Sequence, residues 1–444
     1  MAERGRRQWL TERAFTALFF VLVAAVLLLS DKGQIGGDGE VRWRTLVALM
    51  EDGRVTSDRY TLEMPLAATP LWVSGSVAAS VEGLTGPARL AVVEHFVQRF
   101  NKLVAFAVAA WLYRKLRRDR LLPQGAAGGV LGLLFLSLLI PNAKDFYSEC
   151  LWTFLVCIAL DLFVRESRTR AEGFGLAIAT ALAVPLNPVL APVLLLTAVA
   201  VAIFATPMER HAAWRGGFLA AAGAGFGVCL ALAENLARRG SALDFGYANA
   251  GFTTPLLRGL AGQLVSPARG AVFYLPAFFL GSLLLGARRL EGEMRRFVLV
   301  ASLFGVFLIL AYAKWQAWHG GLYWGPRFLL PLSVLGAVFL ALAWRAFPSG
   351  AARAGLSAVA FVSFASYKAG VAIGLTPFMS CPGEECYWDW ARLPLASWVS
   401  RPDFSEMLSH RSTAVELGAI ALFAALTARD LRRRGRSQPE PARR

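Results

Sequence analysis

Long runs of apolar residues are the feature that most constrains this chain. A helix that crosses the hydrocarbon core of a bilayer needs roughly 20 apolar residues, and runs near this length recur along the 444 residues. Backbone polar groups in the bilayer must find partners within their own segment, which favours helices. Hydrophobic residues make up 56% of the sequence, against roughly 45–50% in soluble domains. The sequence therefore predicts an all-α polytopic membrane protein with about twelve transmembrane helices.

The predicted spans form one transmembrane domain over residues 1–428, followed by a basic, disordered tail over residues 429–444. The basic start of the chain is also compatible with a signal peptide, but no small-residue cleavage site follows Ser30, which favours an uncleaved first span. Pro185 and Pro188 separate the fifth span from the sixth, because a helix cannot continue there without losing hydrogen bonds. The spans are 14–30, 88–113, 122–140, 146–164, 172–186, 189–206, 214–235, 269–286, 297–313, 327–345, 354–374 and 412–428.

Basic residues indicate how the chain is oriented. The formal net charge is +16, and arginine and lysine concentrate in alternate short connections. By the positive-inside rule, those connections and both termini are cytoplasmic. The charge lies beside apolar runs rather than on a soluble surface, which argues against nucleic-acid binding. The predicted outside loops, all small, are 31–87, 237–268, 314–326 and 375–411.

Two cysteines lie in the last outside loop, in the sequence Cys381-Pro-Gly-Glu-Glu-Cys386. An oxidising compartment makes a disulfide between them plausible. A zinc site is less well supported, because no second Cys or His pair lies nearby.

Acidic residues follow the first span in the sequence Gly36-Gly37-Asp38-Gly39-Glu40. A carboxylate close to the membrane surface is able to take a proton from an acceptor hydroxyl as a general base. The alternative is that Asp38 and Glu40 cap the following helix. Tyr60 lies further along the same loop.

The connection between the third and fourth spans carries Lys144, Asp145 and Glu149. The two acids are four residues apart and share a helix face. Glu149 precedes apolar residues, and an ionisable group at membrane depth suggests function. Pairing of these acids with Lys144 or an arginine at the interface is the alternative.

Two further outside segments carry arginine among small and aromatic residues. One is Ser266-Pro-Ala-Arg269-Gly270, and the other runs from Trp315 through His319, Gly320 and Gly321 to Arg327. Arginine matches phosphate oxygens in a fork geometry. The aromatic residues alone would fit an interfacial belt, and a lone His319 would fit a structural role.

Other motifs narrow the class of protein. Gly223, Gly225 and Gly227 lie inside an apolar run, where close helix packing accounts for them better than a nucleotide loop. The sequence contains no Walker motif, no His-Glu-x-x-His and no Gly-x-Ser-x-Gly. These absences argue against nucleotide-driven transport and familiar hydrolases.

The combination of motifs resembles the GT-C superfamily of membrane glycosyltransferases, which includes protein O-mannosyltransferases and lipid A aminoarabinose transferases. The resemblance rests on Gly-Asp-Gly-Glu after the first span, Ser-Pro-x-Arg-Gly, and Trp-x-Gly-Gly-x-x-x-Gly-Pro-Arg. It implies a polyprenyl-phosphate-linked sugar donor, an extracytoplasmic acceptor and inverting transfer. It also implies a bacterial-type inner membrane location with the active face outside, and surrounding lipid as a partner.

The same resemblance assigns roles to residues. Asp38 would be the base and Glu40 its helper, whereas Lys144, Arg269 and Arg327 would hold the donor phosphate. The remaining candidate substrate-site residues are Tyr60, Asp145, Glu149 and His319. A divalent metal bridging Asp38 to the phosphate is compatible with this site, but no ligand cluster in the sequence requires one. The sequence departs from the family in two ways: Gly39 separates the acids, and there is no large soluble C-terminal domain.

Two other classes of function remain open. A transporter or flippase would explain the helix break near Pro185 and Pro188, although internal repeats and charges at the middle of several spans are not evident. A non-catalytic cell-envelope assembly factor would differ from the enzyme by as little as one carboxylate.

Overall fold

The computed structural model describes residues 2–29, 35–119, 121–204, 207–247, 251–286, 290–321, 323–372, 384–393, 413–414 and 416–421. Within these residues every regular element is a helix and no strand occurs, as the apolar runs predicted. The α-helices are α1 (Ala2–Leu29), α2 (Asp38–Asp52), α3 (Glu63–Val81), α4 (Gly86–Val97), α5 (Phe100–Arg118), α6 (Pro123–Phe135), α7 (Leu139–Ala143), α8 (Glu149–Phe163), α9 (Arg170–Leu186), α10 (Leu190–Phe204), α11 (Pro207–Arg239), α12 (Leu256–Val265), α13 (Ala271–Tyr274), α14 (Leu280–Gly286), α15 (Gly292–Lys314), α16 (Leu330–Ala346) and α17 (Gly350–Ala372). The 3₁₀ helices are η1 (Pro276–Phe279), η2 (Arg327–Leu329), η4 (Glu384–Trp388) and η5 (Trp390–Arg392).

Six helical segments among the described residues are long and apolar enough to cross a membrane: Glu12–Leu29, Glu63–Val81, Arg210–Arg239, Gly292–Lys314, Arg327–Ala346 and Gly350–Val371. Five of them overlap predicted spans. The exception is α3, which lies in the segment 31–87 that the sequence predicted to be polar. Its mean hydropathy of 1.2 is the lowest of the six, because small residues and two prolines dilute its apolar character. The total of about twelve spans and the side of each terminus stay predictions.

Several predicted boundaries were wrong, and backbone chemistry accounts for part of this. The predicted span 88–113 is two helices, α4 and α5, which meet at residues 98–99. The predicted span 122–140 ends at Phe135, and α7 is separate. The predicted span 269–286 breaks into α13, η1 and α14, because Pro276 has no N–H for a continuous helix. Most of the predicted span 412–428 and the whole tail 429–444 lie outside the described residues.

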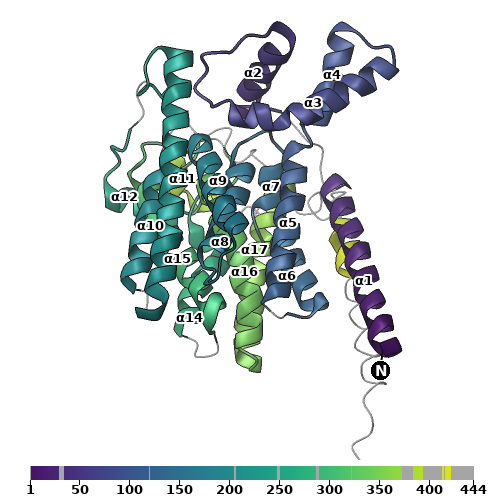
Figure 1. Cartoon of the computed structure of the whole chain (residues 1–444), viewed down its shortest axis with the longest axis vertical. Coiled ribbons are helices and arrows are strands. Elements are labelled where there is room, and N and C mark those ends of the chain that lie inside the picture. The colour runs from purple at the N-terminus through teal and green to yellow at the C-terminus, as the bar shows by residue number, and fades with distance from the viewer. Residues whose placement is uncertain are drawn as a thin grey trace, which may run out of the picture.

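Basic connections gather at one end of the helix bundle. Arg117 pairs with Glu12 at 3.3 Å, and Arg118 pairs with Asp161, which joins the ends of α1, α5 and α8. Arg345 donates to the carbonyl oxygen of Asp119 at 3.0 Å. We call this the arginine-rich end, and the opposite end, where α2 and α4 lie, the loop-rich end (Figure 1). The predicted cytoplasmic connections that carry Arg117, Arg118 and Arg345 thus lie near one another in the structure.

Glycines on α11 allow that helix to pack closely on α9. A Cβ at Gly223 would lie 2.1 Å from Oγ1 of Thr180, and one at Gly227 would lie 2.6 Å from the carbonyl oxygen of Ala181. A Cβ at Gly225 would meet no atom within 4 Å. The structure thus confirms helix packing for Gly223 and Gly227.

Gly223→Ala is therefore expected to lower the free energy of unfolding by about 1–3 kcal/mol, because the added methyl overpacks the α9–α11 interface. Gly225→Ala is the matched control and should leave stability nearly unchanged. Thermal unfolding in detergent measures both variants. Equal melting temperatures for the two would contradict the packing seen here.

Candidate functional site

Arg327 joins two carboxylates at the loop-rich end. Its Nη1 lies 2.9 Å from Oδ2 of Asp38, a residue 289 positions away in the chain. Its Nε lies 3.5 Å from Oε1 of Glu149. Asp38 begins α2, Glu149 begins α8 and Arg327 begins η2. Three helix starts thus bring together three of the residues that the sequence singled out.

Asp38 does not cap its helix through its side chain. The N-cap of α2 is Gly37, and no side chain caps it. The Asp38 carboxylate instead faces Arg327, accepts a hydrogen bond from the Tyr60 hydroxyl, and lies 3.4 Å from Nη2 of Arg59. The side-chain cap of the alternative interpretation is therefore absent, and the catalytic role of Asp38 stays a prediction.

Glycine lets the start of α2 approach the segment before α8. A Cβ at Gly39 would lie 3.2 Å from the backbone nitrogen of Phe146, and one at Gly37 would lie 2.9 Å from the Tyr147 hydroxyl. Larger residues at these positions would push α2 away from the chain that delivers Glu149. The glycines around Asp38 thus allow Asp38 and Glu149 to lie near each other.

Electrostatics keeps Asp38 ionised. Burial alone would raise the pKa of its carboxyl, but Arg327, Tyr60 and Arg42 outweigh it and hold the pKa below its ordinary value. Burial and the Asp38 charge raise the pKa of Tyr60, so its hydroxyl stays a proton donor. Asp38 is therefore a carboxylate at neutral pH and Tyr60 a neutral phenol.

Glu149 is almost fully buried, with 6% of its surface exposed. Its Oε1 faces Arg327, whereas its Oε2 has no hydrogen-bond partner among the described residues. A buried acceptor without a partner is costly unless something binds there. Beside it, Ser148 accepts a hydrogen bond of 3.2 Å from Arg42, whose guanidinium lies 4.0 Å from the Tyr60 ring centroid.

The segment between α15 and η2 forms a compact turn. Gly320 and Gly325 have φ of 76° and 69°, a region that L side chains rarely adopt. Arg269 is fully buried and donates to the carbonyl oxygens of His319 and Gly321, each at 2.9 Å. These contacts give Arg269 a positioning role for the turn that leads to Arg327. Its predicted binding of phosphate stays a prediction.

His319 packs inside this turn. Its ring stacks on Tyr387 of η4 at 4.5 Å between centroids, and its Nδ1 accepts a hydrogen bond from the backbone of Gly321. Burial, followed by the charges of Arg269 and Arg327, lowers the pKa of His319 to about 4. The imidazole is therefore neutral at physiological pH.

The other candidates lie outside the Arg327 contacts. Glu40 is half-exposed and pairs with Arg44 along α2. Lys144 donates to the carbonyl oxygen of Val371 at 2.8 Å, and the backbone carbonyl of Asp145 accepts from Asn101. Cys381 lies outside the described residues, so its pairing with Cys386 stays a prediction. No group of three or more His, Cys, Asp or Glu that could hold a metal occurs among the described residues, and we derive no step through a metal.

Sequence reasoning missed the arginines that support the site. Arg42 and Arg59 contact Tyr60 and Asp38 from α2 and the following loop. Arg238 on α11 donates to the carbonyl oxygens of Thr56, Tyr60 and Asp58, at 2.7, 2.7 and 3.1 Å. We call these three bonds the Arg238 clasp. In the sequence Arg238 stands beside Arg239 like an ordinary charged helix end, so no local signal marks it.

No protein-family model matches this chain, and no curated protein matches it significantly. Among solved structures, it is similar to the crystal structure of ArnT from Cupriavidus metallidurans bound to undecaprenyl phosphate. The TM-score is 0.52 at 14% identity, and the match covers 93% of this chain and 78% of that chain. The chain is thus a multi-pass membrane protein that shares its fold with this structure, in agreement with the resemblance at the level of fold. At this identity the activity does not follow from the fold.

The lowered pKa of Asp38 predicts how its contribution to stability depends on pH. Because the folded-state pKa lies below the unfolded one, the carboxylate stabilises the fold above the unfolded pKa and loses this effect as pH falls through the folded pKa. The melting temperature of wild type should therefore exceed that of Asp38→Asn at pH 7, and the difference should shrink toward pH 3. Asp52→Asn, an exposed acid on the same helix, is the control. A difference between wild type and Asp38→Asn that does not change with pH would contradict the pairing with Arg327.

Proposed function

We propose that this protein is a glycosyltransferase that moves a sugar from a polyprenyl-phosphate donor to an acceptor at the loop-rich end. The observation that carries the proposal is the position of Arg327 between Asp38 and Glu149. A cation that matches phosphate lies beside a carboxylate that can accept a proton, in a fold shared with a protein crystallised with undecaprenyl phosphate. By the predicted topology this end is extracytoplasmic, on an inner membrane.

The proposed reaction is a single displacement. The acceptor hydroxyl oxygen forms a bond to the anomeric carbon while the bond from that carbon to the phosphate oxygen breaks. Polyprenyl phosphate leaves with the electron pair, the hydroxyl proton passes to Asp38, and the configuration inverts. Arg327 stabilises the charge that develops on the leaving phosphate.

The ion pair in the structure suggests how the base is activated. Arg327 holds down the pKa of Asp38 and so weakens it as a base. A donor phosphate that accepts the hydrogen bond from Nη1 of Arg327 would take this partner away from Asp38. The pKa of Asp38 would then rise. Glu149 would keep Arg327 in place during the exchange. The base would then be strongest when the donor is bound.

The remaining candidates take supporting roles in this proposal. Tyr60 orients the Asp38 carboxylate, and Arg269 with His319 shapes the turn before Arg327. Lys144 and Asp145 lie on the segment that leads to Glu149. Glu40, which pairs with Arg44, would assist Asp38 only through the electrostatic effect of its negative charge.

Asp38→Asn is expected to lower donor turnover by about 10²–10⁴-fold, the usual contribution of a general base. The assay measures release of polyprenyl phosphate from a panel of lipid-linked sugars by purified protein in nanodiscs. Asp52→Asn, also on α2, is the matched control and should keep wild-type turnover. Wild-type protein that binds the lipid but turns over no donor would favour the flippase or assembly-factor alternative.

Arg327→Lys is expected to raise the KM for the donor as well as lower kcat, because lysine keeps the charge but loses the fork that grips phosphate oxygens. Asp38→Asn should act mainly on kcat. Steady-state kinetics over donor concentration separate the two effects. An Arg327→Lys variant with an unchanged KM would argue against phosphate binding at Arg327.

A further inference from the structure

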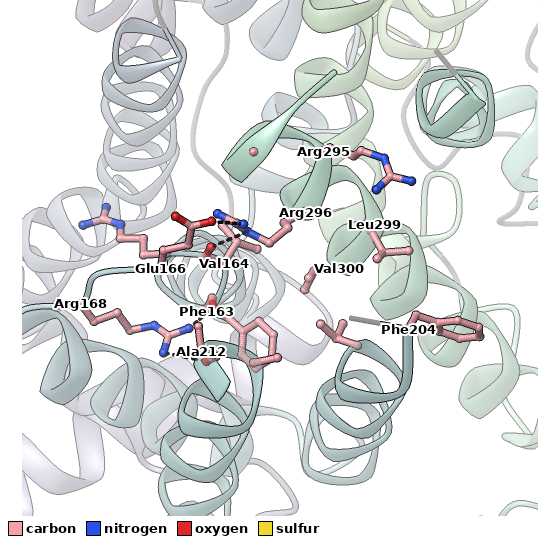
Figure 2. Close-up of a pocket in the computed structure, with 14 residues that line it drawn as sticks. Phe163, Val164, Glu166, Arg168, Phe204, Ala212, Arg295, Arg296, Leu299 and Val300 are labelled. Carbon is pink, nitrogen blue, oxygen red and sulfur yellow. Dashed lines mark hydrogen bonds and ion pairs between the residues drawn. The ribbon is translucent and has the colours of Figure 1, made fainter. Parts of the chain in front are cut away.

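A pocket lies among the ends of α8, α10, α11 and α15 (Figure 2). Its volume is about 110 Å³, several times the space that one water molecule needs. Its charged lining consists of four arginines and one acid: Arg165, Glu166, Arg168, Arg295 and Arg296. Its other lining residues are largely apolar.

This pocket is remote from the Arg327 site. Glu149 begins α8 at the loop-rich end, and Phe163, which lines the pocket, ends it 14 residues later. At 1.5 Å per residue that separation is about 21 Å. Likewise α15 begins at the pocket with Gly292 and ends at Lys314, before the turn that leads to Arg327. The pocket therefore belongs to the arginine-rich end.

The acids around the pocket engage only part of its positive charge. Glu166 pairs with Arg296, and Asp161 and Glu172 pair with Arg165. Arg168 donates instead to backbone carbonyls, including that of Leu162 at 2.8 Å and that of Ala212 at 3.2 Å. These bonds fix Arg168 without neutralising it.

Arg168 is also held tightly against the helix next to it. A Cβ at Gly216 of α11 would lie 2.5 Å from its Nη2, so the guanidinium packs directly against the helix backbone at this glycine. Burial, followed by the charges of Arg215, Arg165 and Arg296, lowers the pKa of Arg168, with Glu293 as the opposing acid. The guanidinium thus lies in a positive field that would favour a bound anion.

Arg295 adds an accessible cation at the edge of the pocket. It is exposed, and its guanidinium makes no hydrogen bond or ion pair with any residue that the structure describes. Figure 2 shows its side chain directed away from the bonded Arg296 and Glu166, and on the opposite side of the view from Arg168. The pocket therefore combines a guanidinium held in place at Arg168 with a long, exposed side chain at Arg295.

An apolar wall adjoins these cations. It includes Phe163, Val201, Leu299 and Val300, and it ends at Phe204, which is 68% exposed on the side of the bundle. Because α10 is a predicted span, we expect this exposed ring to face lipid. A hydrocarbon chain is able to follow the wall while its headgroup lies among the arginines.

We propose that this pocket binds a phosphate group, with Arg295 at its edge pairing with the phosphate oxygens and Arg168 contributing to the positive field of the pocket. The apolar wall makes an anionic membrane lipid the favoured source of that phosphate. Guanidinium groups match phosphate oxygens in a fork geometry, and basic pockets between transmembrane helices suit anionic headgroups. The site is distinct from the proposed transferase site and does not depend on that function.

The test measures binding to the full chain in detergent by native mass spectrometry. The probes are phosphatidylglycerol, phosphatidylcholine and inorganic phosphate. Arg295→Gln should weaken phosphatidylglycerol binding roughly fivefold, the effect of one basic residue near a membrane surface, and Arg295→Lys should restore most of it. Arg114→Gln, an exposed arginine on α5 outside the pocket, is the matched control and should bind as wild type does.

The probes separate the two sources of phosphate. Preference for phosphatidylglycerol over phosphatidylcholine that Arg295→Gln weakens supports the lipid. Inorganic phosphate binding that depends on Arg295, without any preference among lipids, supports the phosphate site and rejects the lipid. Equal binding of all probes by wild type and Arg295→Gln, or an equal loss in Arg114→Gln, would overturn the proposal. Exposed Arg295 tolerates substitution, and an unchanged melting temperature checks that the variant is folded.

Discussion

The loop-rich end depends on the pairing of one buried guanidinium with two carboxylates. A charge taken out of water is stable only with good partners, and removing one partner of a buried pair costs about 3–5 kcal/mol. Arg327 meets this requirement with Asp38 and Glu149, residues far from it in the sequence. The start of α2, the start of α8 and the turn before η2 must therefore meet at one point. The glycines around Asp38 allow this close approach, and the buried hydrogen bonds of Arg269 fix the turn before η2.

The same pairing lowers the reactivity of Asp38 as a base. An arginine that stabilises a carboxylate also makes it a poorer base, so the resting arrangement protects the site from unproductive proton transfer. Under the proposed function, reactivity would come from an anion that competes for the arginine. The ion pair would then be the state before the donor phosphate binds, and Oε2 of Glu149, which has no hydrogen-bond partner among the described residues, would lie on the buried side of that site.

Part of the fold could be predicted from the sequence, and so could several of the residues that meet at Arg327. Apolar runs identified five of the six long apolar helices, and the sequence singled out Asp38, Glu149 and Arg327, whose roles stay predictions. What could not be predicted is which charges meet, because contacts between distant segments leave no local periodicity. Arg42, Arg59 and Arg238 were missed for this reason. Helix α3 was missed because its small residues lower its hydropathy, although it is a continuous helix.

The Arg238 clasp has a consequence for how this protein can change over evolution. It holds the segment Thr56–Tyr60 by main-chain carbonyl oxygens, which every amino acid provides. These three bonds do not depend on the side chains of the segment, although Thr56 and Asp58 also bond the Thr45 hydroxyl through theirs. Substitutions at the exposed Ser57, for example, would alter the surface of this segment while the three backbone bonds remain. Under the proposed function, acceptor preference could then change by mutation in this loop without the rest of the fold having to adjust.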